Sequence, residues 1–171
     1  QAAKDVLTIY YHAFPDSDLL TGKGLVVGGS HQVHPIKDNI QYGDLSGVLL
    51  QNSPFWSNLI RTPELAIALM DEWEGKIEAL AQSTINEPVT SISGVPTWTL
   101  VLLKRILEIT GKTTIKEVWP DFELYIHGGV SFTPYKEQFE KIIGPGCKYI
   151  EIYNASEGFF AAQDNIEEDG M

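Results

Sequence analysis

The chain has 171 residues, and its 12 Lys and Arg against 23 Asp and Glu give a net charge of −11. The length suits one domain, and 43% hydrophobic and 20% charged residues are typical of a globular core rather than a disordered chain. The charge disfavours nucleic-acid binding, the lack of a long apolar run disfavours a membrane span, and the single Cys147 excludes an intramolecular disulfide and favours the cytoplasm.

The first third of the chain predicts a mixed or antiparallel strand region. Residues 6–11 are β-branched and aromatic, and residues 25–27 are apolar and lie between glycines, so both are predicted as strands, with a hairpin turn at 21–24. Beyond them, Leu45, Val48 and Leu49 stand at helical spacing until Pro54 interrupts the pattern.

A long amphipathic helix is predicted to follow residues 62–64. Thr62 is a capping hydroxyl, Pro63 suits the first helical position and Glu64 favours the positive end of a helix. The apolar stripe steps by four, four, four and three residues, and charged residues take the outer faces. The stripe is Leu65, Leu69, Trp73, Ile77 and Leu80, and the outer residues are Asp71, Glu72, Glu74, Lys76 and Glu78.

The second half alternates strands and helices. Residues 89–94, 122–127 and 149–153 are predicted as strands, separated by helices over 96–110 and 133–143 that glycines end. This order predicts a single α/β domain over residues 1–171, built from parallel βαβ units. Ligands gather beyond the carboxyl ends of such strands, which points to three segments. They are residues 94–97, 128–131 and 154–158.

Two of these segments carry candidate chemistry. In residues 153–158, the Ser156 hydroxyl can donate to a phosphate, the Glu157 carboxylate suits Mg²⁺, and Tyr153 offers a flat face, although a solvated turn would have the same composition. Gly128 and Gly129 allow a ligand to approach the backbone closely and allow a positive φ. A tight strand-to-helix turn without a ligand would explain the same two glycines. The two loops together favour a ligand site.

Other signals are weaker. His31 and His34 lack the helical frame or cysteines of a common metal site, and Cys147 has no adjacent base, so a buried structural thiol is expected. The early glycines do not fit a dinucleotide or phosphate-loop pattern, and Ser46 lacks the glycine of a nucleophile elbow. The Trp and Leu stripes of the helices are predicted as core.

A family resemblance rests on these loops. Residues 128–135 (GGVSFTPY), Phe139 and residues 153–160 (YNASEGFF) resemble the adenylate-forming superfamily of acyl-CoA synthetases, luciferases and peptide-synthetase adenylation domains. The residues of these motifs are most similar to those of the Gretchen Hagen auxin-responsive family of acyl acid amido synthetases, especially its bacterial members. Supporting segments are 28–31 (GGSH), 61–65 (RTPEL) and 94–98 (GVPTW).

The resemblance implies an ATP-dependent ligase that forms an acyl-adenylate from a small carboxylic acid and then an amide with an amino acid. It implies that Ser156 bonds the α-phosphate, that Glu157 holds Mg²⁺ and that Tyr153 stacks on adenine. The remaining residues of the nucleotide site would be Gly128, Gly129, Val130, Asn154 and Ala155, and those near the acyl pocket Val95, Pro96 and Thr97. Asn154 departs from the glycine that superfamily members often have.

The resemblance also marks what this chain lacks: the Ser/Thr/Gly-rich phosphate loop, the ribose-binding aspartate and the C-terminal lid. With the abrupt end at Met171, this predicts an internal fragment of a longer enzyme that is inactive alone. Two alternatives stay open, a thioester-forming ligase of the acyl-CoA type and a non-catalytic nucleotide- or acid-binding module. The sequence does not identify the carboxylic acid, the amine or thiol acceptor, or the oligomeric state.

Overall fold

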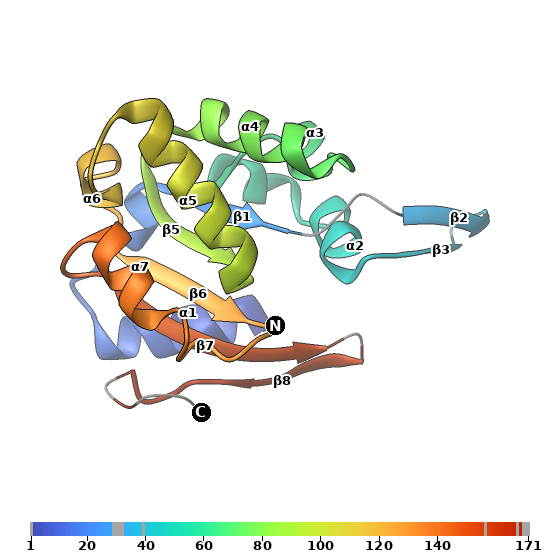
Figure 1. Ribbon diagram of the computed structural model, residues 1–171. Helices are drawn as coiled ribbons and strands as arrows, with labels where there is room; N and C mark the ends of the chain where they lie inside the picture. Colours follow the sequence, from blue (N-terminus) through green and yellow to red (C-terminus); the bar gives the residue numbers. More distant parts are fainter. Residues whose placement is uncertain (1, 29–32, 39, 156, 167, 169–171) are drawn as a thin grey trace.

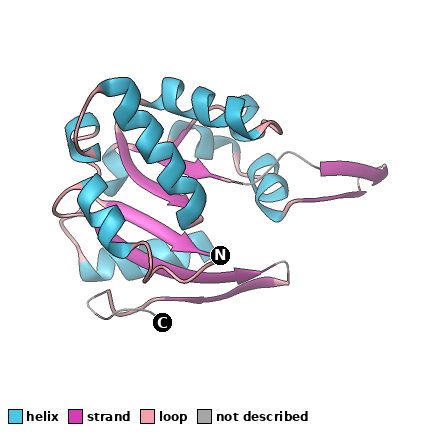
Figure 2. Cartoon of the chain, viewed as in Figure 1, coloured by secondary structure: helices cyan, strands magenta, loops and turns pink. Residues whose placement is uncertain are grey.

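The computed structural model describes residues 2–28, 33–38, 40–155, 157–166 and 168 (Figure 1). Helices and strands alternate along most of the described chain (Figure 2). The helices are α1 (Ala2–Ala13), α2 (Leu45–Gln51), α3 (Leu65–Ala68), α4 (Trp73–Thr84), α5 (Pro96–Thr110), α6 (Ile115–Val118) and α7 (Lys136–Ile143), with the 3₁₀ helices η1 (Leu19–Thr21) and η2 (Phe55–Leu59). The strands are β1 (Lys23–Val27), β2 (Val33–Lys37), β3 (Ile40–Gly43), β4 (Arg61–Thr62), β5 (Val89–Gly94), β6 (Leu124–Gly128), β7 (Lys148–Ala155) and β8 (Gly158–Ala162).

Six strands form the main sheet in the order β4-β1-β5-β6-β7-β8. The first five are parallel, and β8 returns antiparallel to β7. The separate antiparallel pair β2–β3 projects away from the main sheet beyond α2 (Figure 1). The α/β class and the parallel βαβ units are therefore confirmed.

Two hydrophobic clusters lie on opposite faces of this sheet. The larger cluster joins the sheet to α4, α5, α6 and α7, and Leu102, Leu103 and Ile106 of α5 are fully buried in it. The smaller cluster joins α1 to β6 and β7 through Val6 and Tyr10. Alternation along the strands thus assigns one face of β6 and β7 to α1 and the other to α5 and α7. Among the described residues, no helix combines the length and apolar character needed to cross a membrane.

The predicted strand at residues 6–11 is wrong, because these residues belong to α1. Val6 and Tyr10, four residues apart, are buried against Leu124 and Ile150 of the sheet. The helical spacing of these apolar side chains outweighed the β propensity of the individual residue types.

The predicted hairpin turn at residues 21–24 is also wrong. Thr21 ends η1 and Lys23 begins β1, whose neighbours β4 and β5 both run parallel to it. Gly22 is needed for a different reason, since a Cβ there would lie 2.3 Å from the carbonyl oxygen of Pro88.

The predicted long helix after residue 64 is two helices, α3 and α4. Glu72 separates them because its carboxylate accepts hydrogen bonds from the backbone N–H groups of Glu74 at 2.8 Å and Gly75 at 2.5 Å, which caps a new helix. Lys76 does not lie on an outer face as predicted. It is only 1% exposed.

The elements predicted in the second half are confirmed within a few residues. α5 runs from Pro96 to Thr110 and ends at Gly111, whose φ of 66° is left-handed. The short α2 also matches its predicted spacing. By contrast, β8 and α6 were not predicted.

Candidate functional site at the carboxyl edge of the sheet

The three predicted segments come together at one edge of the sheet. Strands β5, β6 and β7 are neighbours, so the loops after Gly94, Gly128 and Ala155 leave the same edge in adjacent positions (Figure 1). The register aligns Gly94 with His127 and Gly128 with Ile152. Segments separated by many residues in the sequence therefore border one surface.

The Gly128-Gly129 pair has the backbone that the sequence predicts. A Cβ on Gly128 would lie 2.3 Å from the carbonyl oxygen of Ile152, so no side chain fits between β6 and β7 there. Gly129 has a φ of 83° and is exposed, and a Cβ on it would touch the Val95 side chain at 3.4 Å. The loops after β5 and β6 are thus in contact range, with Val130 exposed beside them.

The loop after β5 leads directly into α5. Val95 is its N-cap residue, Pro96 occupies the first helical turn and Thr97 is half-buried. Gly94 leaves no space for a side chain, since a Cβ would lie 2.8 Å from the Thr99 hydroxyl oxygen. The backbone at this end of β5 is therefore tightly held.

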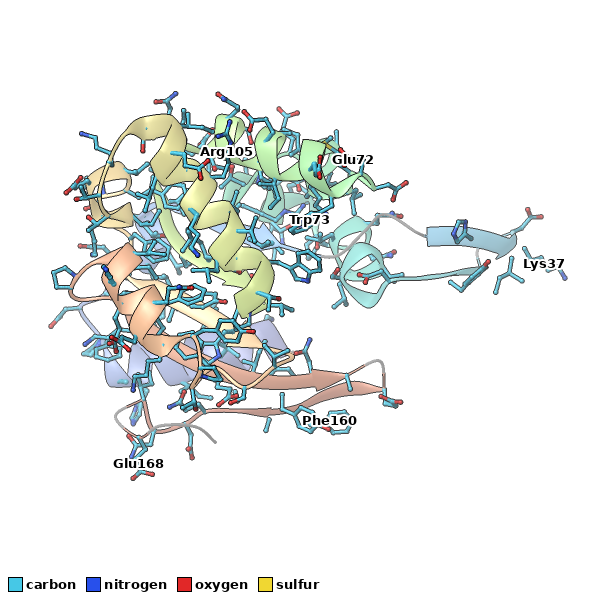
Figure 3. The ribbon with its side chains drawn as sticks, in the orientation of Figure 1. Lys37, Glu72, Trp73, Arg105, Phe160 and Glu168 are labelled. Atoms are coloured by element: carbon cyan, nitrogen blue, oxygen red, sulfur yellow. The ribbon has the colours of Figure 1, made fainter. Side chains whose placement is uncertain are left out.

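Trp98 corrects the prediction that the tryptophan stripes are core. It lies in the first turn of α5 and is 47% exposed. Its ring meets that of Trp73, at the start of α4, with centroids 4.0 Å apart in an edge-to-face arrangement. Figure 3 shows Trp73 beside α5.

The β7–β8 hairpin carries the remaining candidates. Tyr153 is 54% exposed near the end of β7, and its ring lies 5.3 Å from that of Phe160 on β8. Asn154 and Ala155 complete the strand, and Glu157 is exposed in the turn. Ser156 lies outside the described residues. An aromatic pair and an exposed carboxylate thus lie at this corner of the sheet.

A cavity of about 220 Å³ lies below this edge, on the face of the sheet covered by α7. His127 at the end of β6 and Glu151 of β7 line it and are aligned in register. His127 is only 3% exposed, and burial lowers the pKa of its imidazole to about 4. The imidazole is therefore neutral near pH 7.

The comparison with known families decides the assignment. The family model of the GH3 family N-terminal domain matches residues 3–147, which is most of the chain. The chain belongs to the GH3 family.

Solved structures agree on the fold of this GH3 chain. In total, 16 chains match, among them a GH3.15 acyl acid amido synthetase with a TM-score of 0.65 and 13% sequence identity. The match covers 96% of this chain and 39% of that protein, so this GH3 chain spans well under half the length of the synthetase. At this identity the likeness shows a shared fold. No curated protein matches the sequence.

Sequence reasoning did not single out three side chains that lie near this edge of the GH3 domain. Trp98 lay within an apolar helical stripe, and His127 and Glu151 lay within strands, so no local pattern set them apart. Lys76 is a fourth case with a structural role: its Nζ donates to the carbonyl oxygen of Gly28 at 3.2 Å, which ties α4 to the end of β1. Burial lowers the pKa of Lys76, while the carboxylates of Asp44 and Asp71 act in the opposite direction.

The weaker candidates gain no support as sites. His34 is exposed beside Tyr42, and His31 lies outside the described residues. Within the described part of the chain, no group of three or more His, Cys, Asp or Glu side chains could hold a metal ion. Cys147 is half-buried, and desolvation raises the pKa of its thiol to about 12, so it is protonated near neutral pH.

Proposed function

We propose that this GH3 chain is the nucleotide- and acyl-binding core of an ATP-dependent acyl acid–amino acid ligase. The observation that carries the proposal is the convergence of residues 95–97, residues 128–130, residues 153–155 and Glu157 on the carboxyl edge of three adjacent parallel strands. Membership of the GH3 family supports it.

The proposed residue roles follow the three loops. Gly128, Gly129 and Val130 line the adenine, and Tyr153, exposed on β7, stacks on it. Asn154 and Ala155 complete the nucleotide site, and Ser156 donates to the α-phosphate. On the other side, Val95, Pro96 and Thr97 border the acyl group.

The proposed reaction has two steps. A carboxylate oxygen of the acid attacks the α-phosphorus of ATP, and pyrophosphate leaves, which converts a poor leaving group into AMP. The amine nitrogen of an amino acid then attacks the acyl carbon, and the C–O bond to AMP breaks while the nitrogen loses a proton. Bound Mg²⁺ would neutralise phosphate charge.

Glu157 suits Mg²⁺ because it is an exposed carboxylate in the turn next to the proposed phosphate position. With no cluster of acidic, histidine or cysteine side chains among the described residues, ATP phosphates and water would supply the other oxygens. We place Glu157 and Ser156 as the catalytic pair.

We also propose that the chain is one domain within a longer enzyme of bacterial type, that this enzyme works in the cytoplasm, and that the chain alone does not catalyse adenylation. The match over 39% of the synthetase supports the first of these statements. Comparing turnover by the 171-residue chain and by the full-length protein tests the last. Equal rates would contradict it.

The central test is ATP–pyrophosphate exchange by the full-length protein with a panel of carboxylic acids. Acid-dependent exchange is expected, and Glu157→Ala should lower it on the order of 100-fold, because metal stabilisation of phosphate charge contributes several kcal/mol. The unfolding free energy should change by less than about 0.5 kcal/mol, since the side chain is exposed. Asp121→Ala, exposed before the amino end of β6, is the matched control.

The outcomes separate the alternatives. No exchange with any acid would contradict adenylation and favour a non-catalytic binding module. Exchange followed by product formation with a thiol, but not with amino acids, would replace the amide with a thioester. A large loss of stability in Glu157→Ala with exchange unchanged would make that residue structural.

A further inference from the structure

A cavity of about 630 Å³ lies at the amino end of the main sheet. One wall comes from residues 58–67, which run through β4 into α3, and the other from Lys23, Ser83 and Glu87. Lys23 begins β1, and Glu87 comes just before β5. Because β5 has 6 residues, each rising by about 3.3 Å, this cavity lies roughly 20 Å from the carboxyl edge.

Arg61 brings a half-buried guanidinium to this cavity without a carboxylate partner. Its Nη2 donates to Oδ1 of Asn58 at 2.6 Å, and its Nη1 lies 3.4 Å from the hydroxyl oxygen of Ser53. Both acceptors are neutral, and among the residues that the structure describes Arg61 forms no ion pair. Burial lowers the pKa of its guanidinium, as expected for a cation that loses water without gaining an anion. A carboxylate on a ligand would complete this cation.

Glu64 brings the opposite charge to the same cavity. It is the N-cap residue of α3, but its exposed carboxylate accepts no hydrogen bond from the start of that helix. Within the described part of the chain it also forms no ion pair, even with Arg61 three residues earlier. The cavity therefore presents a cation and a carboxylate that do not neutralise each other.

The other groups in the cavity wall define the kind of ligand that fits. Lys23 and Glu87 are already paired, with Nζ and Oε2 2.6 Å apart. With two cations and two carboxylates in its wall, the cavity has no net charge. A simple anion would meet two carboxylates and a metal ion would meet two cations, whereas a zwitterion complements both kinds of group. Pro63, Leu65 and Ile67 add an apolar part to the wall.

We propose that this cavity binds a free amino acid with an apolar side chain. Arg61 receives its α-carboxylate, Glu64 receives its α-ammonium group, and the apolar part of the wall contacts its side chain. An amine that attacks the acyl group must reach the carboxyl edge, roughly 20 Å away. An amino acid in this cavity is therefore an effector and not the acceptor. This inference goes beyond the proposed function and does not depend on it.

The test is calorimetric titration of the full-length protein with L-leucine and two analogues that each lack one of its charges. The analogue 4-methylpentanoate keeps the carboxylate, and 3-methylbutylamine keeps the ammonium group. Leucine should bind more tightly than either analogue by on the order of 10- to 100-fold, the range of a charge-assisted hydrogen bond. The 171-residue chain should bind leucine equally well, because every proposed contact lies within it.

Two variants separate the two charges. Arg61→Gln should weaken leucine binding on the order of tenfold or more and leave the binding of 3-methylbutylamine unchanged. Glu64→Gln should weaken leucine binding similarly and leave that of 4-methylpentanoate unchanged. Because Glu64 is exposed, this variant should fold even if Arg61→Gln does not. Glu74→Gln, at an exposed position in the first turn of α4, is the matched control and should bind leucine like the wild type.

Three results would overturn the inference. They are no leucine binding at millimolar concentration, equal affinities for leucine and 4-methylpentanoate, and leucine binding that a folded Glu64→Gln leaves unchanged. The ATP–pyrophosphate exchange that tests the proposed function is a separate assay. Leucine binding without exchange would contradict only the proposed function, and exchange without leucine binding would contradict only this inference.

Discussion

The two faces of β6 and β7 are built from the same strands and differ in kind. Toward α1, Leu124, Ile126, Ile150 and Ile152 keep an apolar surface along the strands. Toward α5 and α7, the buried Tyr125 gives way to polar groups as the strands approach the carboxyl edge. These polar groups are His127, Glu151 and the exposed Tyr153. One face therefore stays apolar, while the other changes from apolar core to polar groups along its length.

The largest expected effects are losses of stability, and they arise on both faces of the sheet. Phe139→Ala removes a fully buried ring stacked on Tyr125, with centroids 4.8 Å apart, and should cost about 3–5 kcal/mol of unfolding free energy in urea. Ile150→Ala, on the α1 face, should cost about 2–5 kcal/mol. At temperatures where the Ile150→Ala variant of the full-length protein stays folded, its acid-dependent ATP–pyrophosphate exchange should be unchanged. A lost exchange in this folded variant would contradict the contrast between the faces.

A smaller effect concerns pH. The folded-state pKa of His127 is about 4, below the ordinary value near 6.5, so between these values the unfolded chain binds a proton that the folded chain does not. The contribution of His127 is thus fully present above about pH 6.5 and is lost as the pH falls toward 4. From pH 7 to pH 5, the wild type should lose about 2 kcal/mol more than His127→Gln in urea unfolding. His12→Gln, at an exposed position near the end of α1, should show the same pH dependence of the unfolding free energy as the wild type. The same pH dependence in the wild type and both variants would refute this prediction.

The smallest effect isolates binding from folding. Gly129 and Gly146 have φ values of 83° and 84°, so alanine at either position should cost about 1–2 kcal/mol. Only Gly129 lies in the proposed nucleotide site, and Gly146 has open space around it. Gly129→Ala should therefore weaken AMP binding while Gly146→Ala does not, as measured by calorimetry. Equal losses of AMP affinity in the two variants would mean that the substitutions act through the stability of the fold and not through the binding site.

The elements of the second half were predictable because their signals are local. Pro96 at the start of a helix, Gly111 at its end and the apolar run of β5 each identify an element without reference to distant residues. The ends of these elements then place residues 95–97, 128–130 and 153–155 at one edge. The convergence of these segments therefore follows from sequence, and their role as a binding site stays a proposal.

The parts that escaped prediction depend on tertiary contacts. Lys76 looks like a surface lysine until α4 places it against the end of β1. The pairing of His127 with Glu151 requires the register of two strands, which no local pattern gives. The misread helix α1 is different, because the spacing of Val6 and Tyr10 contained the signal but residue propensity was given more weight.

The most direct test of the central claim is a titration of the isotope-labelled chain with AMP, followed by backbone amide NMR. The account predicts that the largest shifts fall within residues 94–97, 128–131 and 151–157, with little change in α1. Shifts concentrated instead around Lys23, Arg61 and Glu87, at the amino end of the sheet, would contradict it. A spectrum that millimolar AMP leaves unchanged would contradict nucleotide binding by this chain.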